Sequence, residues 1–288
     1  MPRQLLDTSG QDFYQNAFTL IDLPPKDLPH ALPELSGLQP AANQEGLPRL
    51  LGEVARNVQH TYQGLTTIVA DEQVRHALCD LRGEIKTTGR QEFRYMLIAH
   101  HEVGEEQIEE YRAGLDGNPA QANELKDVAT EGFASLWAIF YPANLTGSRF
   151  RYLGLQTVSE HTTNVIGFAE KPDWAQVRGL EHVGPEGQAV VVLYQGVVWC
   201  DAATKKILKM RADLLKPRLD VKLELLTIEI NFDEVHFSDA AHTTAWVPEE
   251  VAVTTVWNGQ VIRDEHLYSN YALPEASHKV LASPKTKR

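Results

Sequence analysis

The 288-residue chain has only two cysteines, no long apolar run and no excess of basic residues. Cys79 and Cys200 cannot form a disulfide framework. A single bridge and two buried thiols both stay open, and we expect buried thiols because free cysteine is commonly buried. No segment approaches the ~20 apolar residues of a membrane-spanning helix. The net charge of −12 argues against nucleic-acid binding and against a polybasic grip on anionic lipid.

The N-terminus lacks a charged segment followed by an apolar one, so the sequence shows no export signal. Two interpretations remain open. The chain is either an intracellular protein, or an exported one whose signal was removed before Met1.

Histidine and cysteine spacings typical of metal sites, H-E-x-x-H and C-x-x-C, do not occur. The candidate cluster is "AHHEVGEE", but in a strand the side chains of His100 and His101 point to opposite faces. A zinc site would therefore need distant ligands such as Glu102, His242 or His266. We expect no metal and no cofactor; a metal-dependent hydrolase using His100 and His101 is the alternative hypothesis.

Other catalytic patterns are equally weak. No G-x-S-x-G elbow or phosphate-binding loop is present. Cys200 lies beside Asp201, whose carboxylate would raise the pKa of the thiol, so a buried structural cysteine is favoured over a nucleophile. The acidic pairs do not predict two carboxyls facing each other across a cleft, and we interpret them as surface residues; they are Glu105/Glu106, Glu109/Glu110 and Glu249/Glu250.

Six prolines between residues 22 and 48 predict an extended N-terminal arm, because proline removes a hydrogen-bond donor and disfavours helix before it. A helix should follow it. Leu47, Leu50, Val54 and Val58 recur at helical spacing, and Gly64 suits the end.

Beyond this helix the apolar pattern has a period near two, which is typical of strands. Asn258-Gly259 between two such runs is the sequence of a type I′ hairpin, since both positions need positive φ. Strands at this spacing without alternating helices indicate an antiparallel sheet. The predicted strands lie within 66–80, 90–102 and 106–115, then at 149–158, 162–170, 188–199, 205–213, 222–237, 248–257 and 260–271.

One further helix is predicted over residues 123–140. Its wide apolar stripe includes Phe133, Leu136, Trp137 and Phe140 and must bury itself against something large. The predicted fold class is α+β, a large curved antiparallel sheet forming an unclosed barrel, with one or two helices packed in its concave side. We expect an arm at 1–45, one domain at 46–272 and a disordered tail at 273–288.

Three stretches resemble the bacterial outer-membrane lipoprotein carrier superfamily, the LolA/LolB-like fold. They are "FRYLGLQTVSEHTTNVIGFAEKP", "GVVWCDAATKKILKM" and "EINFDEVHF…AWVPEEVAVTTVWNG" with the final "LYSNY". The same stretches resemble more closely large bacterial secreted proteins for which no activity is established. The resemblance implies an unclosed barrel with a lipophilic cavity, and a periplasmic or secreted location.

The functional hypothesis is a non-catalytic cell-envelope protein that binds a lipophilic molecule or acyl chain between sheet and helix. An envelope scaffold with a filled barrel is a further alternative. On the helix the expected ligand-binding residues are Phe133, Leu136, Trp137 and Phe140. On the strands they are the inward-compatible aromatics Phe93, Tyr95, Tyr152, Trp199 and Trp257. Trp199 and Val197 would face the concave side, with the Asp201 turn on the rim.

Overall fold

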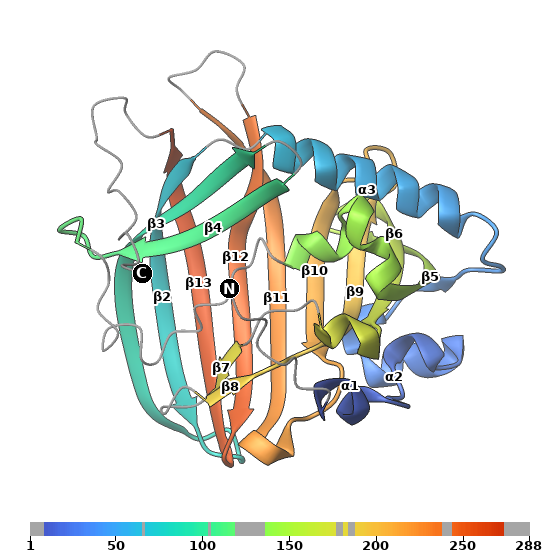
Figure 1. Ribbon diagram of the computed structural model, residues 1–288, viewed down its shortest axis with the longest axis horizontal. Coiled ribbons are helices and arrows are strands. Elements are labelled where there is room, and N and C mark those ends of the chain that lie inside the picture. Colours follow the sequence, from blue (N-terminus) through green and yellow to red (C-terminus); the bar gives the residue numbers. More distant parts are fainter. Residues whose placement is uncertain are drawn as a thin grey trace, which may run out of the picture.

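A single large sheet dominates the fold. The structure is a computed structural model that describes residues 9–64, 67–102, 105–118, 136–176, 181–183, 188–237 and 244–273. Within them, eleven strands form one sheet in the order β1-β5-β6-β9-β10-β11-β12-β13-β2-β3-β4. Its strand pairings are all antiparallel. The sheet curves strongly but does not close, since β1 and β4 remain its two edges (Figure 1). This confirms the predicted fold class.

The strands agree with the predicted ones to within a few residues at most ends. They are β1 (Gln39–Pro40), β2 (Ile68–Cys79), β3 (Ile85–Glu102), β4 (Glu105–Ala113), β5 (Ser148–Val158), β6 (His161–Glu170), β9 (Tyr194–Asp201), β10 (Ile207–Leu214), β11 (Leu223–His236), β12 (Thr244–Trp257) and β13 (Gln260–Ala272). A separate two-stranded ribbon consists of β7 (Glu181–Val183) and β8 (Gln188–Val190).

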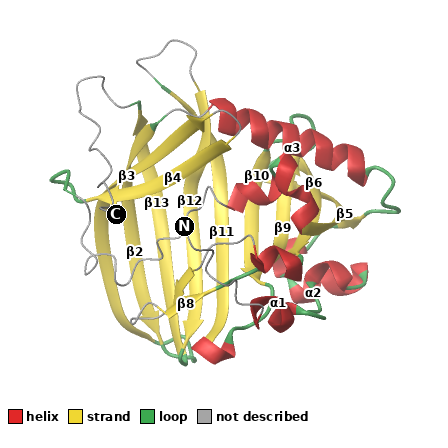
Figure 2. Ribbon diagram, in the orientation of Figure 1, coloured by secondary structure: helices red, strands yellow, loops and turns green. Residues whose placement is uncertain are grey.

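Most of the described helices gather on one side of the molecule, beside β5, β6, β9 and β10 (Figure 2). The α-helices are α1 (Ser9–Tyr14), α2 (Leu28–Ala31) and α3 (Leu47–Gly64). The 3₁₀ turns are η1 (Leu20–Asp22), η2 (Pro25–Asp27), η3 (Pro33–Leu35), η4 (Ala138–Phe140), η5 (Pro142–Gly147), η6 (Pro172–Gln176) and η7 (Leu219–Val221).

The second predicted helix, 123–140, lies mainly outside the described residues, which resume at Leu136. Its described end is helical at Leu136 and Trp137 and tightens into η4. Pro142 then begins η5, because proline fits the first turn of a helix and cannot continue the preceding one.

The two faces of the sheet carry different partners. On β6 and β9, Ile166 and Val198 belong to the main core, which also contains residues of α3, and we call this the inner face. Their neighbours Val165 and Val197 point the opposite way, to the outer face. There they pack against residues 20–38, which belong to the N-terminal segment (residues 9–45). Both faces of these strands are therefore buried, which explains their nearly continuous apolar runs.

The N-terminal segment that we expected to be extended consists largely of short helical turns. Its prolines begin these turns, as Pro25 does in η2 and Pro33 in η3, because their fixed φ suits a first helical position. Leu28, Leu32 and Leu35 are almost completely buried and pack on the outer face of the sheet. The segment thus covers apolar strand surface that would otherwise be exposed.

Two turns follow directly from the sequence. Asn258 and Gly259 have φ of 50° and 74° and join β12 to β13, as the predicted type I′ hairpin requires. In the β9–β10 turn, Asp201 Oδ1 accepts hydrogen bonds from the backbone N–H of Ala203 and Thr204 at 3.0 and 2.6 Å. The aspartate at the end of this strand is therefore a turn residue.

We predict that the N-terminal segment contributes to the stability of the domain. Leu35→Ala should lower the free energy of unfolding by about 2–5 kcal/mol, because it leaves a cavity under a fully buried leucine. Urea denaturation followed by circular dichroism measures this change. Phe18→Ala is the control, since this ring is 69% exposed, and should change stability by less than about 0.5 kcal/mol. Equal stability of Leu35→Ala and the unmodified chain would contradict the prediction.

Candidate ligand-binding site

The inner face of the sheet is apolar across most of its width. Buried aliphatic and aromatic side chains continue from β6 through β9, β10, β11 and β12 to β13, β2 and β3. They include Ile166, Phe168, Val198, Met210, Ile228, Ile230, Phe232, Val251, Val253, Tyr268, Ile68, Ala70, Tyr95 and Leu97. Helix α3 runs across one end of this face and contributes Leu50, Val54, Val58 and Tyr62 (Figure 1).

Trp137, which precedes η4, makes aromatic contacts with both the sheet and helix α3. Its ring stacks on Phe232 of β11, with centroids 4.8 Å apart, and lies 6.2 Å from Tyr62 of α3. Nearby, Phe140 lies 5.3 Å from Phe150 and 5.8 Å from Phe168. Aromatic pairs at these separations stabilise packing beyond their buried area alone.

The structure brings most of the predicted ligand residues to this inner core. Leu136, Trp137, Phe140 and Tyr95 are buried members, and Tyr152 and Trp257 pack against it while partly exposed. Phe93 is buried and lies two positions from Tyr95 on β3, on the same face. Phe133 lies outside the described residues.

Trp199 is the exception, and its predicted inward position is wrong. It is buried on the outer face with Val197, beneath the leucines of the N-terminal segment, and its Nε1–H donates to Gln156 Oε1 at 2.9 Å. Because side chains alternate along β9, Val198 and Cys200 face inward instead. The spacing of Leu28, Leu32 and Leu35 was the sequence signal that the N-terminal segment covers a second apolar face of the sheet.

Glu72 is a charged residue buried within the inner face, and it was not among the residues predicted from the sequence. On β2 it alternates with the same period as Ile68, Ala70 and Val74, so its side chain lies on the same face as theirs. This alternation was the sequence signal that Glu72 is buried. Its side chain is fully buried. Burying an isolated carboxylate costs a large amount of free energy, so Glu72 needs partners.

The partners of Glu72 come from β4 and β13. Arg112 on β4 donates two hydrogen bonds to the carboxylate, at 2.6 and 2.8 Å. His266 Nδ1 lies 2.8 Å from Oε1, and the Tyr268 hydroxyl donates to the same oxygen at 3.0 Å. We call Glu72, Arg112, His266 and Tyr268 the Glu72 cluster; its carboxylate and guanidinium charges compensate each other.

Electrostatics favour the ionised form of this carboxylate. Burial raises the pKa of Glu72, but the hydrogen bond from His266 and the charge of Arg112 outweigh it and lower the pKa to about 2. Burial opposes the charge of Arg112 as well, and Glu72 overcomes that effect and raises the pKa of Arg112. The pair therefore stays ionised at neutral pH.

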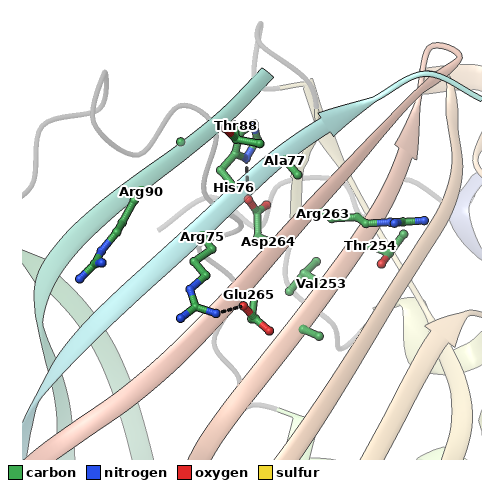
Figure 3. A pocket seen from close by; sticks show the side chains of 12 residues that line it. Arg75, His76, Ala77, Thr88, Arg90, Val253, Thr254, Arg263, Asp264 and Glu265 are labelled. Atoms are coloured by element: carbon green, nitrogen blue, oxygen red, sulfur yellow. Dashed lines mark hydrogen bonds and ion pairs between the residues drawn. The ribbon is translucent and has the colours of Figure 1, made fainter. Parts of the chain in front are cut away.

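A second histidine–carboxylate pair lies on the same face, where His76 Nδ1 is 2.6 Å from Asp264 Oδ1 (Figure 3). On the opposite face of these strands, Arg75 pairs with Glu265 at 3.0 Å. A hollow of about 560 Å³ is lined by twelve residues of β2, β3, β12 and β13, including both pairs. None of the predicted ligand residues lines this hollow.

Among the described residues, no site supports the alternative catalytic hypotheses. His100 and His101 are in β3, but their side chains lie outside the described structure, and so does all of His242. No group of three histidine, cysteine or acidic residues among the described ones could hold a metal ion. Cys79 and Cys200 are free and buried, and burial strongly raises the pKa of Cys200, which disfavours a thiolate nucleophile.

The chain has a distant structural likeness to several solved proteins. No protein-family model and no curated protein matches the chain. Solved structures with a similar fold include an outer membrane lipoprotein-sorting protein domain from Vibrio parahaemolyticus, at 13% identity and a TM-score of 0.39, covering 79% of this chain and 93% of that one. A DUF1329 family protein from Desulfovibrio piger has 10% identity and a TM-score of 0.39, with 80% and 94% covered.

The third similar structure is the Mycobacterium tuberculosis lipoprotein LppX, at 11% identity and a TM-score of 0.25, with 79% and 97% of the two chains covered. Among the described helices, none is long and apolar enough to cross a membrane.

We predict that Glu72→Gln destabilises the fold by about 3–5 kcal/mol at pH 7, because it leaves the buried Arg112 without a counter-charge. The pKa of Glu72 is lower in the folded chain than its ordinary value of 4.5. Its stabilising effect is therefore complete above pH 4.5 and is lost as the pH falls towards 2.

Urea titrations of the unmodified and variant chains at pH 7 and at pH 3 measure this difference. The gap between them should be smaller at pH 3. Glu53→Gln is the matched control, since Glu53 forms an exposed pair with Arg49 on α3, and it should cost less than about 0.5 kcal/mol. If the difference in unfolding free energy between the unmodified chain and Glu72→Gln increased towards pH 3, the ionised Glu72–Arg112 pair would be contradicted.

Proposed function

We propose that the protein binds a lipophilic molecule, such as one with an acyl chain, between the inner face of the sheet and the helical cover formed by α3 and η4. The observation that carries the proposal is the apolar inner face, which extends from β6 to β3 while most of the described helices gather beside β5, β6, β9 and β10. An extended apolar surface inside a curved sheet suits a chain-like apolar ligand, which needs few polar contacts.

The energetics are sufficient for such binding. Burying one CH₂ group is worth about 0.8 kcal/mol, so a ten-carbon chain could contribute ~8 kcal/mol before entropic losses. Sites for small molecules commonly span ~300–1,000 Å³. Trp137, Phe140 and Leu136 would contact the ligand from the cover, while Tyr95 and Phe93 would contact it from the sheet. Phe133, Tyr152 and Trp257 are proposed as further contacts.

We also propose that the protein works in the cell envelope, in the periplasm or after secretion, and without catalysis. Support comes from the three sequence stretches that resemble lipoprotein carriers. Cell fractionation with an antibody against the native protein would test the location, and recovery in the cytoplasmic fraction would contradict it.

The binding proposal predicts that protein purified from a bacterial host retains a lipid. Native mass spectrometry should show a mass above that of the chain, and organic extraction should release the compound. In Trp137→Asp the retained fraction should fall by tenfold or more, because a carboxylate then faces the apolar interior.

Phe18→Asp is the matched control, since that ring is exposed, and it should retain lipid like the unmodified chain. Near-ultraviolet circular dichroism establishes that each variant is folded. If Trp137→Asp unfolds, Trp137→Leu keeps the interior apolar and tests the same contact. A ligand-free native protein that also fails to take up lipid from micelles would leave only a filled barrel, as in a scaffold.

A further inference from the structure

The Tyr95 hydroxyl is a buried polar group with no hydrogen-bond partner among the described residues. Tyr95 is 1% exposed, and no described residue accepts from or donates to its Oη. Leaving a buried hydroxyl unsatisfied costs free energy, so each such group in a folded protein calls for an explanation. The position is on the inner face of β3, two residues from Leu97 and two from Phe93.

The surroundings of Tyr95 are polar but balanced in charge. Its ring lies 4.9 Å from that of Tyr268, whose hydroxyl is already donated to Glu72. Its partner in strand pairing is Arg112, whose guanidinium is held by two bonds to Glu72. The nearby Tyr271 hydroxyl donates to the Pro248 carbonyl at 2.6 Å.

The protonation of Tyr95 defines what it can offer. Burial raises its pKa well above the ordinary value, and the charge of nearby Glu110 raises it further. The hydroxyl is therefore protonated at pH 7 and can donate a hydrogen bond to an acceptor oxygen. An anionic group would lack a free counter-charge in the Glu72 cluster and would face Glu110, so a second buried negative charge is disfavoured.

We infer that Tyr95 is a binding residue for the head group of an uncharged lipophile, which supplies an alcohol or carbonyl oxygen as the missing partner of its hydroxyl. This inference rests on the proposed function, because the apolar remainder of the ligand would lie along the inner face towards Trp137. It adds the ligand class: a neutral, single-oxygen head group in place of a carboxylate, phosphate or ammonium.

The test uses displacement of the neutral fluorescent probe N-phenyl-1-naphthylamine by 1-dodecanol, dodecane, dodecanoate and dodecylammonium. The unmodified protein should bind dodecanol more tightly than the other three. In Tyr95→Phe the affinity for dodecanol should fall about threefold to tenfold, the effect of one hydrogen bond, while the affinities for dodecane and the probe stay the same.

Tyr95→Phe removes only an unsatisfied hydroxyl, so the ligand-free variant should be as stable as the unmodified chain or more so. Tyr111→Phe is the matched control, because Tyr111 is exposed on the same pair of strands, and it should change no affinity. Unchanged dodecanol binding in Tyr95→Phe would identify Tyr95 as a packing residue only and overturn the inference. So would a preference for dodecanoate or dodecylammonium.

The outcomes separate the two proposals. If the probe does not bind the unmodified protein and native mass spectrometry finds no lipid, the proposed function itself fails. If the probe binds and dodecane competes as well as dodecanol, the function stands and the inference about the head group fails.

Discussion

The structure depends on one constraint: a curved sheet that does not close must protect two edges and bury apolar side chains on both faces. At one edge, β1 of the N-terminal segment pairs with β5, and Gly154 allows this approach because any Cβ there would overlap the Gln39 carbonyl oxygen. At the other edge, β4 carries Arg112, whose inward charge is bound by Glu72. Inward charges on edge strands oppose pairing with a further chain.

Local patterns in the sequence were enough to predict the sheet, because strands and hairpins follow from period-two alternation and from turn chemistry such as Asn258-Gly259. The faces were harder to predict where both are apolar. On β9, Val197, Val198 and Trp199 are all buried, so alternation alone could not show which of them face inward. The answer depends on the N-terminal leucines, more than 160 positions earlier in the chain.

The Glu72 cluster could not be predicted for a related reason. Its members are separated by 40 residues between Glu72 and Arg112 and by 194 between Glu72 and His266. Each of them looks like an ordinary strand polar residue by itself. Only the strand order β13-β2-β3-β4, which brings the end of the chain beside its first long strand, assembles them. Local sequence signals carry no information about such pairing.

If the proposed ligand lies in the interior, its entry requires movement of the helical cover, because Trp137 is stacked on Phe232. The sheet is the less deformable partner, because its strands are joined by long antiparallel ladders, as in β11–β12 and β2–β13. Helix α3 packs on the inner core through Leu50, Val54, Val58 and Tyr62, and Asn57 Nδ2 donates a hydrogen bond to the Thr204 carbonyl. Separating apolar side chains exposes surface that an acyl chain can cover again, whereas breaking a ladder leaves backbone groups unpaired. Moving α3 and η4 away from the sheet therefore costs less free energy than opening the sheet. During such a movement the sheet would keep its structure, and Tyr95 and the Glu72 cluster would keep their positions on its inner face.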